Sequence, residues 1–292
     1  MSLVLPTSCL KQYLDKAPAQ GLTETQIFSK LDNFKHFFDA VYYGQKMYSG
    51  TNSDYNIKVG FPLYWDLWDQ KYSMESVTDA SDQGRYMEGH AWKSGNMSET
   101  IVNKLTYDGA RNPVLESMFT DIRICNMALS KVDMIEDADD YAKNDLRGQA
   151  YFVRAFCHLT LMNWWGPMPY LTKVIGPDDQ WDIPRLSKHE CLTKIAQDFD
   201  SAYTYFALAG KIRRDPGVGQ ANHLNYGSYN GGGNEMYRPN GMAALGYKSR
   251  ALLFRASPLN TEGDANDWKE AAQAAWNALQ TALAQGDRKS VV

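Results

Sequence analysis

Residues 146–164 read LRGQAYFVRAFCHLTLMNW, and this stretch decides the fold class. Its apolar and small residues recur three and four positions apart, which is the spacing of one face of an α-helix. The members of this stripe are Ala150, Phe152, Ala155, Phe156, Leu159 and Met162. The helix must end before Gly166-Pro-Met-Pro169, because proline lacks the backbone N–H that would continue it. We therefore expect a long helix followed by a tight turn.

Helical spacing also appears in segments on both sides of this stretch. The helix after the turn should begin at Ser187, because Ser187 and Glu190 have the spacing of a capping box. The other expected helices cover residues 27–43, 114–135, 187–208, 243–256 and 268–283. Alternating apolar runs typical of strands are absent from the sequence. The sequence therefore predicts an all-α protein.

The last four expected helices form two consecutive pairs, 146–164 with 189–208 and 243–256 with 268–283. Small residues stand where the helices of each pair would cross closely, and these are Ala150 and Ala155 in the first pair and Ala243, Ala251 and Ala272 in the second. Stacked helical hairpins of this kind resemble tetratricopeptide repeats. Long irregular loops rich in glycine, asparagine and aromatic residues interrupt the array at 48–97 and 213–239. Such loops are typical places for binding residues.

Composition excludes several classes of protein. The 30 Lys+Arg and 34 Asp+Glu residues give a net charge of -4, which argues against nucleic-acid binding by charge. A hydrophobic content of 44% excludes disorder over most of the length. No run of apolar residues is long enough to predict a transmembrane helix. Cysteines 125, 157 and 191 lie in apolar helical patterns without metal-binding spacing, so we expect them buried, with no metal and no cofactor.

Four landmarks occur in an order that resembles a known family. They are Ser8-Cys9 with Tyr13-Leu-Asp-Lys-Ala-Pro18; Arg147-Gly-Gln-Ala-Tyr-Phe-Val-Arg-Ala with Trp165-Gly-Pro-Met-Pro-Tyr170; Ile183-Pro-Arg-Leu-Ser with Asp198-Phe-Asp-Ser-Ala202; and the helix that ends in Ala256-Ser-Pro-Leu-Asn260. Together they resemble the SusD/RagB family of outer-membrane nutrient-binding lipoproteins. One departure precedes the last landmark, where Tyr237-Arg-Pro-Asn-Gly241 replaces the family's Gly-Arg-x-Thr entry. Family members are also much longer than this chain.

This resemblance implies a SusD-like α-α superhelix that is lipid-anchored in the outer membrane at the cell surface. It implies a non-catalytic protein that captures glycans, with a TonB-dependent transporter of the SusC type as its partner. Cys9 is the implied lipidation site, within a remnant of a lipoprotein signal at 1–9. Residues 10–286 would form the helical domain, as the N-terminal part of a longer protein. We expect residues 287–292, DRKSVV, to be a non-native tail, because they break off an Ala-rich helix.

Glycans present flat C–H faces and rings of hydroxyl groups, so their sites combine an aromatic plane with amide, carboxylate or guanidinium groups. The segment 64–96 offers this mixture, and its Ser-Asp-Gln at 81–83 resembles the family's Ser-Asp-Glu landmark. We expect Trp92 to be the stacking platform, unless it packs beneath its own loop. The predicted glycan-binding residues are Trp92, Asn96, Arg85, Tyr72 and Asp82. Trp164, Trp165 and Trp181 flank the proline turn and are expected to be structural.

Two other functions stay open. An all-α glycoside hydrolase needs two carboxylates at a set distance, and neighbouring candidates are Asp66 with Asp69, Asp79 with Asp82, and Asp178 with Asp179. None of these pairs lies in a catalytic motif, so we expect no catalytic residue. A tetratricopeptide-type scaffold would instead bind peptide on its concave helical face. His158 lies in an apolar helix and is expected to be a hydrogen-bonded core residue.

Overall fold

The computed structural model describes residues 24–43, 95, 113–213, 238–259 and 264–286. Within these ranges the regular structure is helical and no strand occurs, which confirms the predicted all-α class. The helices are α1 (Glu24–Phe28), α2 (Leu31–Phe38), α3 (Ala40–Tyr43), α7 (Pro113–Lys131), the 3₁₀ helix η4 (Val132–Met134), α8 (Asp140–Trp165), α9 (Lys188–Leu208), α11 (Gly241–Ala256) and α12 (Ala265–Ala284).

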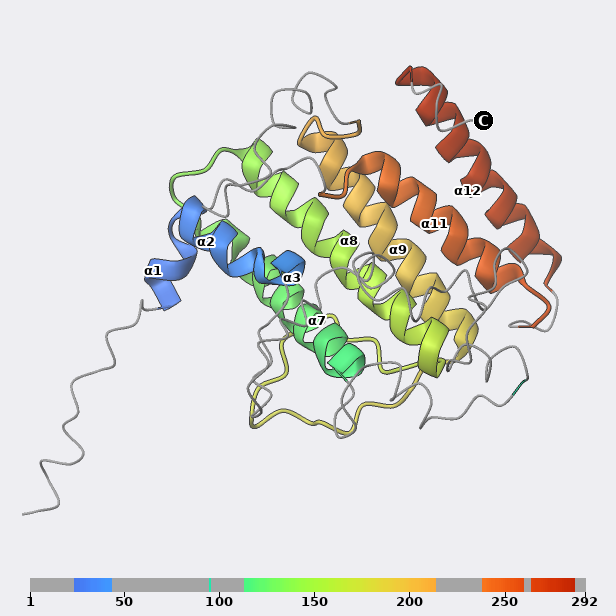
Figure 1. The fold of residues 1–292 in the computed structure, drawn as a ribbon, viewed down its shortest axis with the longest axis horizontal. Coiled ribbons are helices and arrows are strands. Elements are labelled where there is room, and N and C mark those ends of the chain that lie inside the picture. The colour runs from blue at the N-terminus through green and yellow to red at the C-terminus, as the bar shows by residue number, and fades with distance from the viewer. Residues whose placement is uncertain (1–23, 44–94, 96–112, 214–237, 260–263, 287–292) are drawn as a thin grey trace, which may run out of the picture.

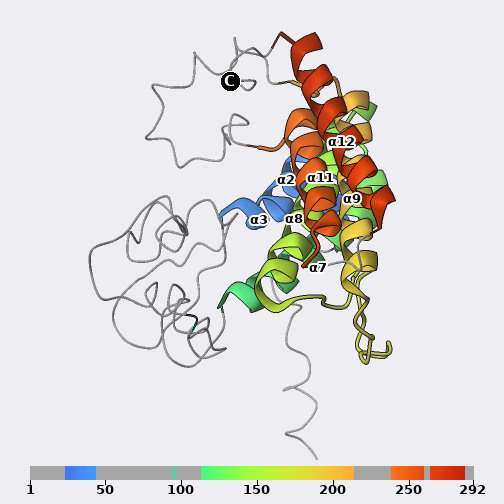
Figure 2. The same ribbon diagram turned by 90° about the vertical axis from the view of Figure 1, so that its right-hand side faces the viewer.

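The long helices form one continuous array. Helices α7, α8, α9, α11 and α12 pack each against the next and run in alternating directions (Figure 1). Both predicted hairpins, α8 with α9 and α11 with α12, are present. The additional contact between α9 and α11 joins them. The turned view shows the array edge-on, with the loop between α8 and α9 extending beyond the helix ends (Figure 2).

Local capping explains where α8 and α9 begin and end. The side chain of Asp139 accepts a hydrogen bond from the backbone N–H of Ala142 at 2.8 Å, so α8 begins six residues before the predicted start at 146. Gly166 ends this helix with a φ of 76°, a conformation that favours glycine. The capping box of Ser187 and Glu190 is present at the start of α9, as predicted.

The single helix predicted over 27–43 is wrong, because the structure divides this segment into α1, α2 and α3. The break has a tertiary cause. The backbone N–H of Leu31 donates to Oδ1 of Asp137 at 2.8 Å, so a residue far along the chain caps the start of α2. The rings of Phe28 and Phe37 meet edge-on across this break, with centroids 5.0 Å apart.

Small residues pack between the helices of each hairpin, but one of the predicted small residues, Ala272, lies on the wrong face. Ala150, Ala155 and Ala251 are buried as predicted. Ala272 is exposed, and its neighbour Ala271 is buried instead. One residue along a helix turns the side chain by about 100°, so Ala272 points away from the face that Ala271 buries.

Helix α8 forms the centre of the hydrophobic core, because it lies between α7 and α9. A Cβ atom on Gly148 would lie 2.8 Å from the ring of Phe206, so only glycine allows this approach of α8 to α9. Cys125, Cys157 and Cys191 are buried in the same core and are free thiols, as expected. Of the helices that the structure describes, none has the length and apolar character needed to cross a membrane.

Candidate functional site

The glycan-binding residues predicted from the sequence, Trp92, Asn96, Arg85, Tyr72 and Asp82, lie outside the described residues. The predicted lipidation site, Cys9, also lies outside them. Their roles therefore stay predictions. The structure does describe landmarks in the second half of the chain, and residues of two of them, Arg154 with Tyr170 and Asp198, meet at one buried site.

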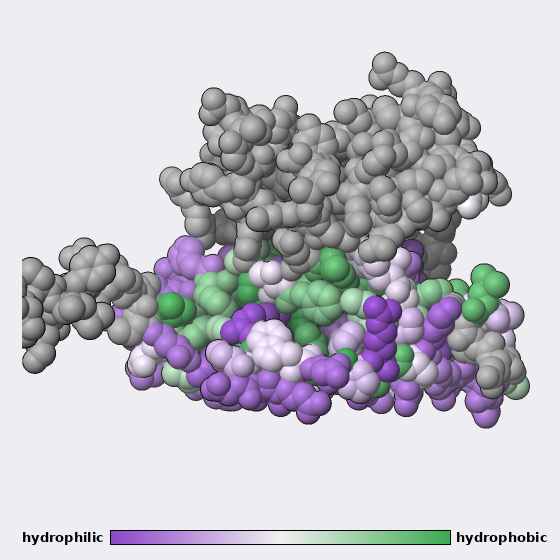
Figure 3. Space-filling view, turned by 90° about the horizontal axis from the view of Figure 1, so that it is seen from below, coloured by the Kyte–Doolittle hydropathy of each residue, from purple (hydrophilic) through white to green (hydrophobic). Residues whose placement is uncertain are grey.

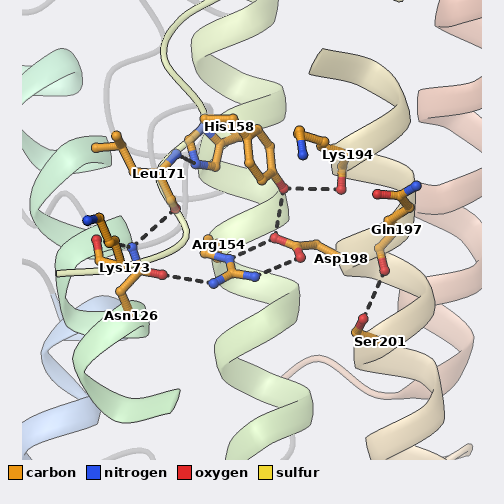
Figure 4. A network of polar contacts seen from close by, with 10 residues as sticks. Asn126, Arg154, His158, Leu171, Lys173, Lys194, Gln197, Asp198 and Ser201 are labelled. Atoms are coloured by element: carbon orange, nitrogen blue, oxygen red, sulfur yellow. Dashed lines mark hydrogen bonds and ion pairs between the residues drawn. The ribbon is translucent and has the colours of Figure 1, made fainter. Parts of the chain in front are cut away.

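Arg154 stands at the centre of this site (Figure 4). Its Nε and Nη2 atoms donate to Oδ2 and Oδ1 of Asp198, both at 2.7 Å. Its remaining Nη1 donates to Oδ1 of Asn126 at 2.8 Å. The pair joins α8 to α9, and Asn126 adds α7. This fork-to-fork geometry uses both carboxylate oxygens and suits a buried ion pair.

The same network holds the proline turn that follows α8. The hydroxyl of Tyr170 lies 2.7 Å from Oδ2 of Asp198, and its ring stacks on His158 with centroids 4.0 Å apart. Nδ2 of Asn126 donates to the carbonyl oxygens of Leu171 and Lys173 at 3.1 and 3.2 Å. Residues of three helices thus hold the start of the loop between α8 and α9.

Electrostatics agree with this geometry. Burial alone would lower the pKa of Arg154, but the hydrogen bonds and charge of Asp198 outweigh it and raise this pKa above its usual value. Burial, reinforced by Asp198, raises the pKa of Tyr170 well above its usual value. Burial lowers the pKa of His158 to about 3. At neutral pH, Arg154 is therefore charged, and His158 is neutral and accepts a hydrogen bond from Leu171, as a core histidine.

A second buried arginine lies between α9, α11 and α12. Nη2 of Arg255 lies 2.9 Å from Oδ1 of Asp267 and also contacts Glu270. Its Nη1 donates to Thr193 at 3.0 Å, and Nε2 of His189 lies 3.1 Å from the same oxygen of Asp267. Among the described residues, Nε of Arg255 and Oδ2 of Asp267 have no hydrogen-bond partner. This cluster connects the two hairpins.

A third ion pair fastens the entry to α11 against the N-terminal helices. Arg238, in the segment that departs from the family pattern, lies 2.8 Å from Oδ1 of Asp39. Its guanidinium group also lies over the ring of Tyr42, 5.0 Å from the centroid. Tyr42 donates in turn to Gln149 of α8 at 2.9 Å. Arg238 therefore has a structural role, although the segment around it departs from the family pattern.

The loop between α8 and α9 carries an exposed aromatic residue. Trp181, which was expected to be structural, is 65% exposed, and its indole N–H donates to the carbonyl oxygen of Pro177. Asp179, one member of a candidate catalytic pair, accepts a hydrogen bond from the backbone N–H of Gly176 at 2.9 Å. It closes a turn there. Over the described ranges, no group of histidine, cysteine or acidic residues could hold a metal ion.

Sequence reasoning missed the pairing of Arg154 with Asp198. A signal was available, because an arginine within an apolar helical stripe must find an anion if it is buried. The sequence does not show which anion this is, because Asp198 lies 44 positions away.

The segment that contains this site also matches known proteins. The sequence model of SusD-like proteins, described as starch-binding and associating with the outer membrane, matches residues 63–210. That is just over half of the 292 residues. The chain belongs to the SusD-like family. No curated protein matches this SusD-like sequence.

Solved structures show the same fold. A SusD-like carbohydrate-binding protein from Bacteroides fragilis superposes with a TM-score of 0.55 at 16% identity, over 87% of this chain and 41% of that protein. A SusD-like carbohydrate-binding protein from Bacteroides vulgatus gives 0.54 at 15% identity, over 87% and 45%. The chain thus spans less than half the length of these two relatives.

Proposed function

We propose that this chain belongs to a cell-surface protein of the outer membrane that captures oligosaccharides and catalyses no reaction. The observation that carries the proposal is the family match over residues 63–210. The buried network supports it, because Arg154, Tyr170 and Asp198 all come from landmarks of that family and lie together in the structure.

The proposed division of labour has three parts. The helices of residues 10–286 form a scaffold, and the segment 64–96 supplies the glycan site. In that site Trp92 stacks on a sugar ring, while Arg85, Asn96, Tyr72 and Asp82 bind hydroxyl groups. Cys9 carries the lipid anchor, and a TonB-dependent transporter of the SusC type receives the captured glycan.

The test of glycan capture is calorimetric titration of the purified chain with maltoheptaose, cellohexaose, xylohexaose and oligogalacturonide. We expect saturable binding of at least one of these, and Trp92→Ala should weaken it by about tenfold or more. A matched control is Trp276→Ala, which removes an exposed tryptophan from α12. Absence of binding across this set of glycans would count against the function.

The same incubations separate capture from hydrolysis. Reducing ends should not increase over hours with any of these glycans. If they do increase, and if substitution of an aspartate pair such as Asp178 and Asp179 stops it, the all-α hydrolase is the correct function instead.

The anchor and the partner need a cellular experiment. Expressed with a lipoprotein leader in a Bacteroides host, the protein should incorporate labelled palmitate and fractionate with the outer membrane. Cys9→Ser should abolish both. A TonB-dependent transporter should co-purify with the anchored protein after mild detergent extraction, and its absence would contradict the partnership.

A further inference from the structure

The loop between α8 and α9 projects from the helices (Figure 2), and hydrogen bonds join it to α7. Its start is fastened by the network around Arg154, as Figure 4 shows. Further along, Nη1 of Arg123 on α7 donates to the carbonyl oxygen of Ile175 at 2.8 Å. Pro177 and Pro184 bracket the next segment and restrict its backbone. The loop is therefore tied to α7 at Leu171, Lys173 and Ile175.

Trp181 stands at the exposed part of this loop. Its indole N–H donates to the carbonyl oxygen of Pro177 at 3.4 Å, and the backbone N–H of Ile183 donates to the carbonyl oxygen of Trp181 at 3.0 Å. Asp179 closes the preceding turn through Gly176. With 65% of the residue exposed, the indole ring is open to solvent, while its N–H is hydrogen-bonded within the loop.

The sequence neighbours of Trp181 carry groups that bind sugar hydroxyls. Asp178, Gln180, Asp182 and Arg185 are all exposed and lie within four positions of Trp181. Carboxylates accept hydroxyl protons, and amide and guanidinium groups donate to hydroxyl oxygens. The side of the molecule on which this loop lies is shown in Figure 3, where hydrophilic residues predominate along the rim away from the grey atoms.

We propose that Trp181, with Asp178, Gln180 and Asp182, forms a sugar-binding subsite for neutral pyranose rings, separate from the one predicted around Trp92. The C–H face of a sugar ring would stack on the indole, and the flanking side chains would bind its hydroxyl groups. This inference rests on the proposed function and adds a second contact point for the same class of ligand.

The local charge sets the class of glycan. The segment 178–185 contains three aspartates and one arginine, so its formal charge is negative. A uronate carboxylate on the ligand would be repelled there. The subsite should therefore prefer neutral oligosaccharides to oligogalacturonide.

The test compares two surface tryptophans on the purified 292-residue chain. Binding of maltoheptaose, cellohexaose and xylohexaose is measured by calorimetry and by saturation-transfer NMR. Trp181→Ala should weaken binding of the preferred glycan by about tenfold, whereas Trp181→Phe, which retains an aromatic plane, should stay within about threefold. Trp276→Ala is the matched control and should leave affinity unchanged, because Trp276 is similarly exposed but lies on a helix.

The outcomes separate the Trp181 subsite from the site predicted around Trp92. If Trp181→Ala binds as well as Trp276→Ala, or if both weaken equally, the subsite is refuted. If Trp92→Ala abolishes binding while Trp181→Ala retains it, the proposed function stands and this inference fails. If Trp181→Ala weakens binding and Trp92→Ala does not, the subsite stands and the predicted site fails. If no glycan binds the unmodified chain, both proposals fall.

Discussion

The two buried arginines of this array have similar burial but different surroundings. The side chains of Arg154 and Asp198 are 6% and 10% exposed, and those of Arg255 and Asp267 are both 4% exposed. The guanidinium of Arg154 is matched on all sides by Asp198 and Asn126. Arg255 leaves Nε unpaired among the described residues and shares its charge with the more exposed Glu270.

The difference shows that burial alone does not measure the value of an ion pair. A buried charge is stabilising to the extent that its hydrogen bonds are complete, because the desolvation penalty is similar in both cases. The complete network lies where α7, α8, α9 and the proline turn meet. The incomplete one connects the last two hairpins. We infer that the first determines the geometry of the array and that the second is tolerant of change.

The largest expected effect is that of Asp198→Asn. This change keeps the shape of the side chain but leaves the buried charge of Arg154 without a carboxylate. We expect a loss of about 3–5 kcal/mol in the free energy of unfolding. Urea titration followed by circular dichroism measures it.

The matched change at the second pair is Asp267→Asn, which should cost only about 1–2 kcal/mol in the same assay. Glu270 remains there as an anion for Arg255. Equal losses for the two variants, or a larger loss at Asp267, would contradict the distinction between complete and incomplete networks.

Asp121 on α7 is a third buried ionisable group to compare. Burial raises the pKa of its carboxyl from 3.8 to about 8. Between these values the folded protein retains a proton that the unfolded chain releases, so this group makes stability fall as pH rises from about 4 to about 8. Asp121→Asn cannot ionise. We expect it to stabilise the protein by about 1–2 kcal/mol at pH 8 and to change little at pH 4, as measured by thermal unfolding at both pH values.

His158 should give a smaller effect of opposite sign. Burial lowers its pKa from 6.5 to about 3, so the unfolded chain binds a proton that the folded protein does not. Stability from this group is therefore present above pH 6.5 and is lost as pH falls toward 3. His158→Gln retains a hydrogen-bond acceptor for Leu171. It should make the decline between pH 6.5 and 4 shallower by about 1 kcal/mol in urea titrations, and an unchanged slope would refute this.

The smallest expected effect on stability is that of Trp181→Ala. Because the ring is exposed, the free energy of unfolding should change by less than about 0.5 kcal/mol. If stability is unchanged, any loss of glycan binding in this variant comes from the missing ring and not from unfolding. A loss above 2 kcal/mol would show that the loop depends on this ring for its fold.

The sequence by itself determined the elements whose signals are local. The capping box of Ser187 and Glu190 and the stop at Gly166 depend on residues within a few positions, so the sequence pattern predicted both. The family landmarks are likewise short, and they identified the SusD-like fold before any coordinate was known.

Only the tertiary structure decided the features that depend on distant partners. Asp137 breaks the helix predicted over 27–43, and packing on α11 selects Ala271 rather than Ala272 as the buried residue of α12. Asp198 becomes the partner of Arg154 across 44 positions, and Trp181 is left exposed by a loop that three helices hold in place. Periodicity reports which residues share a face, but only packing determines what that face meets.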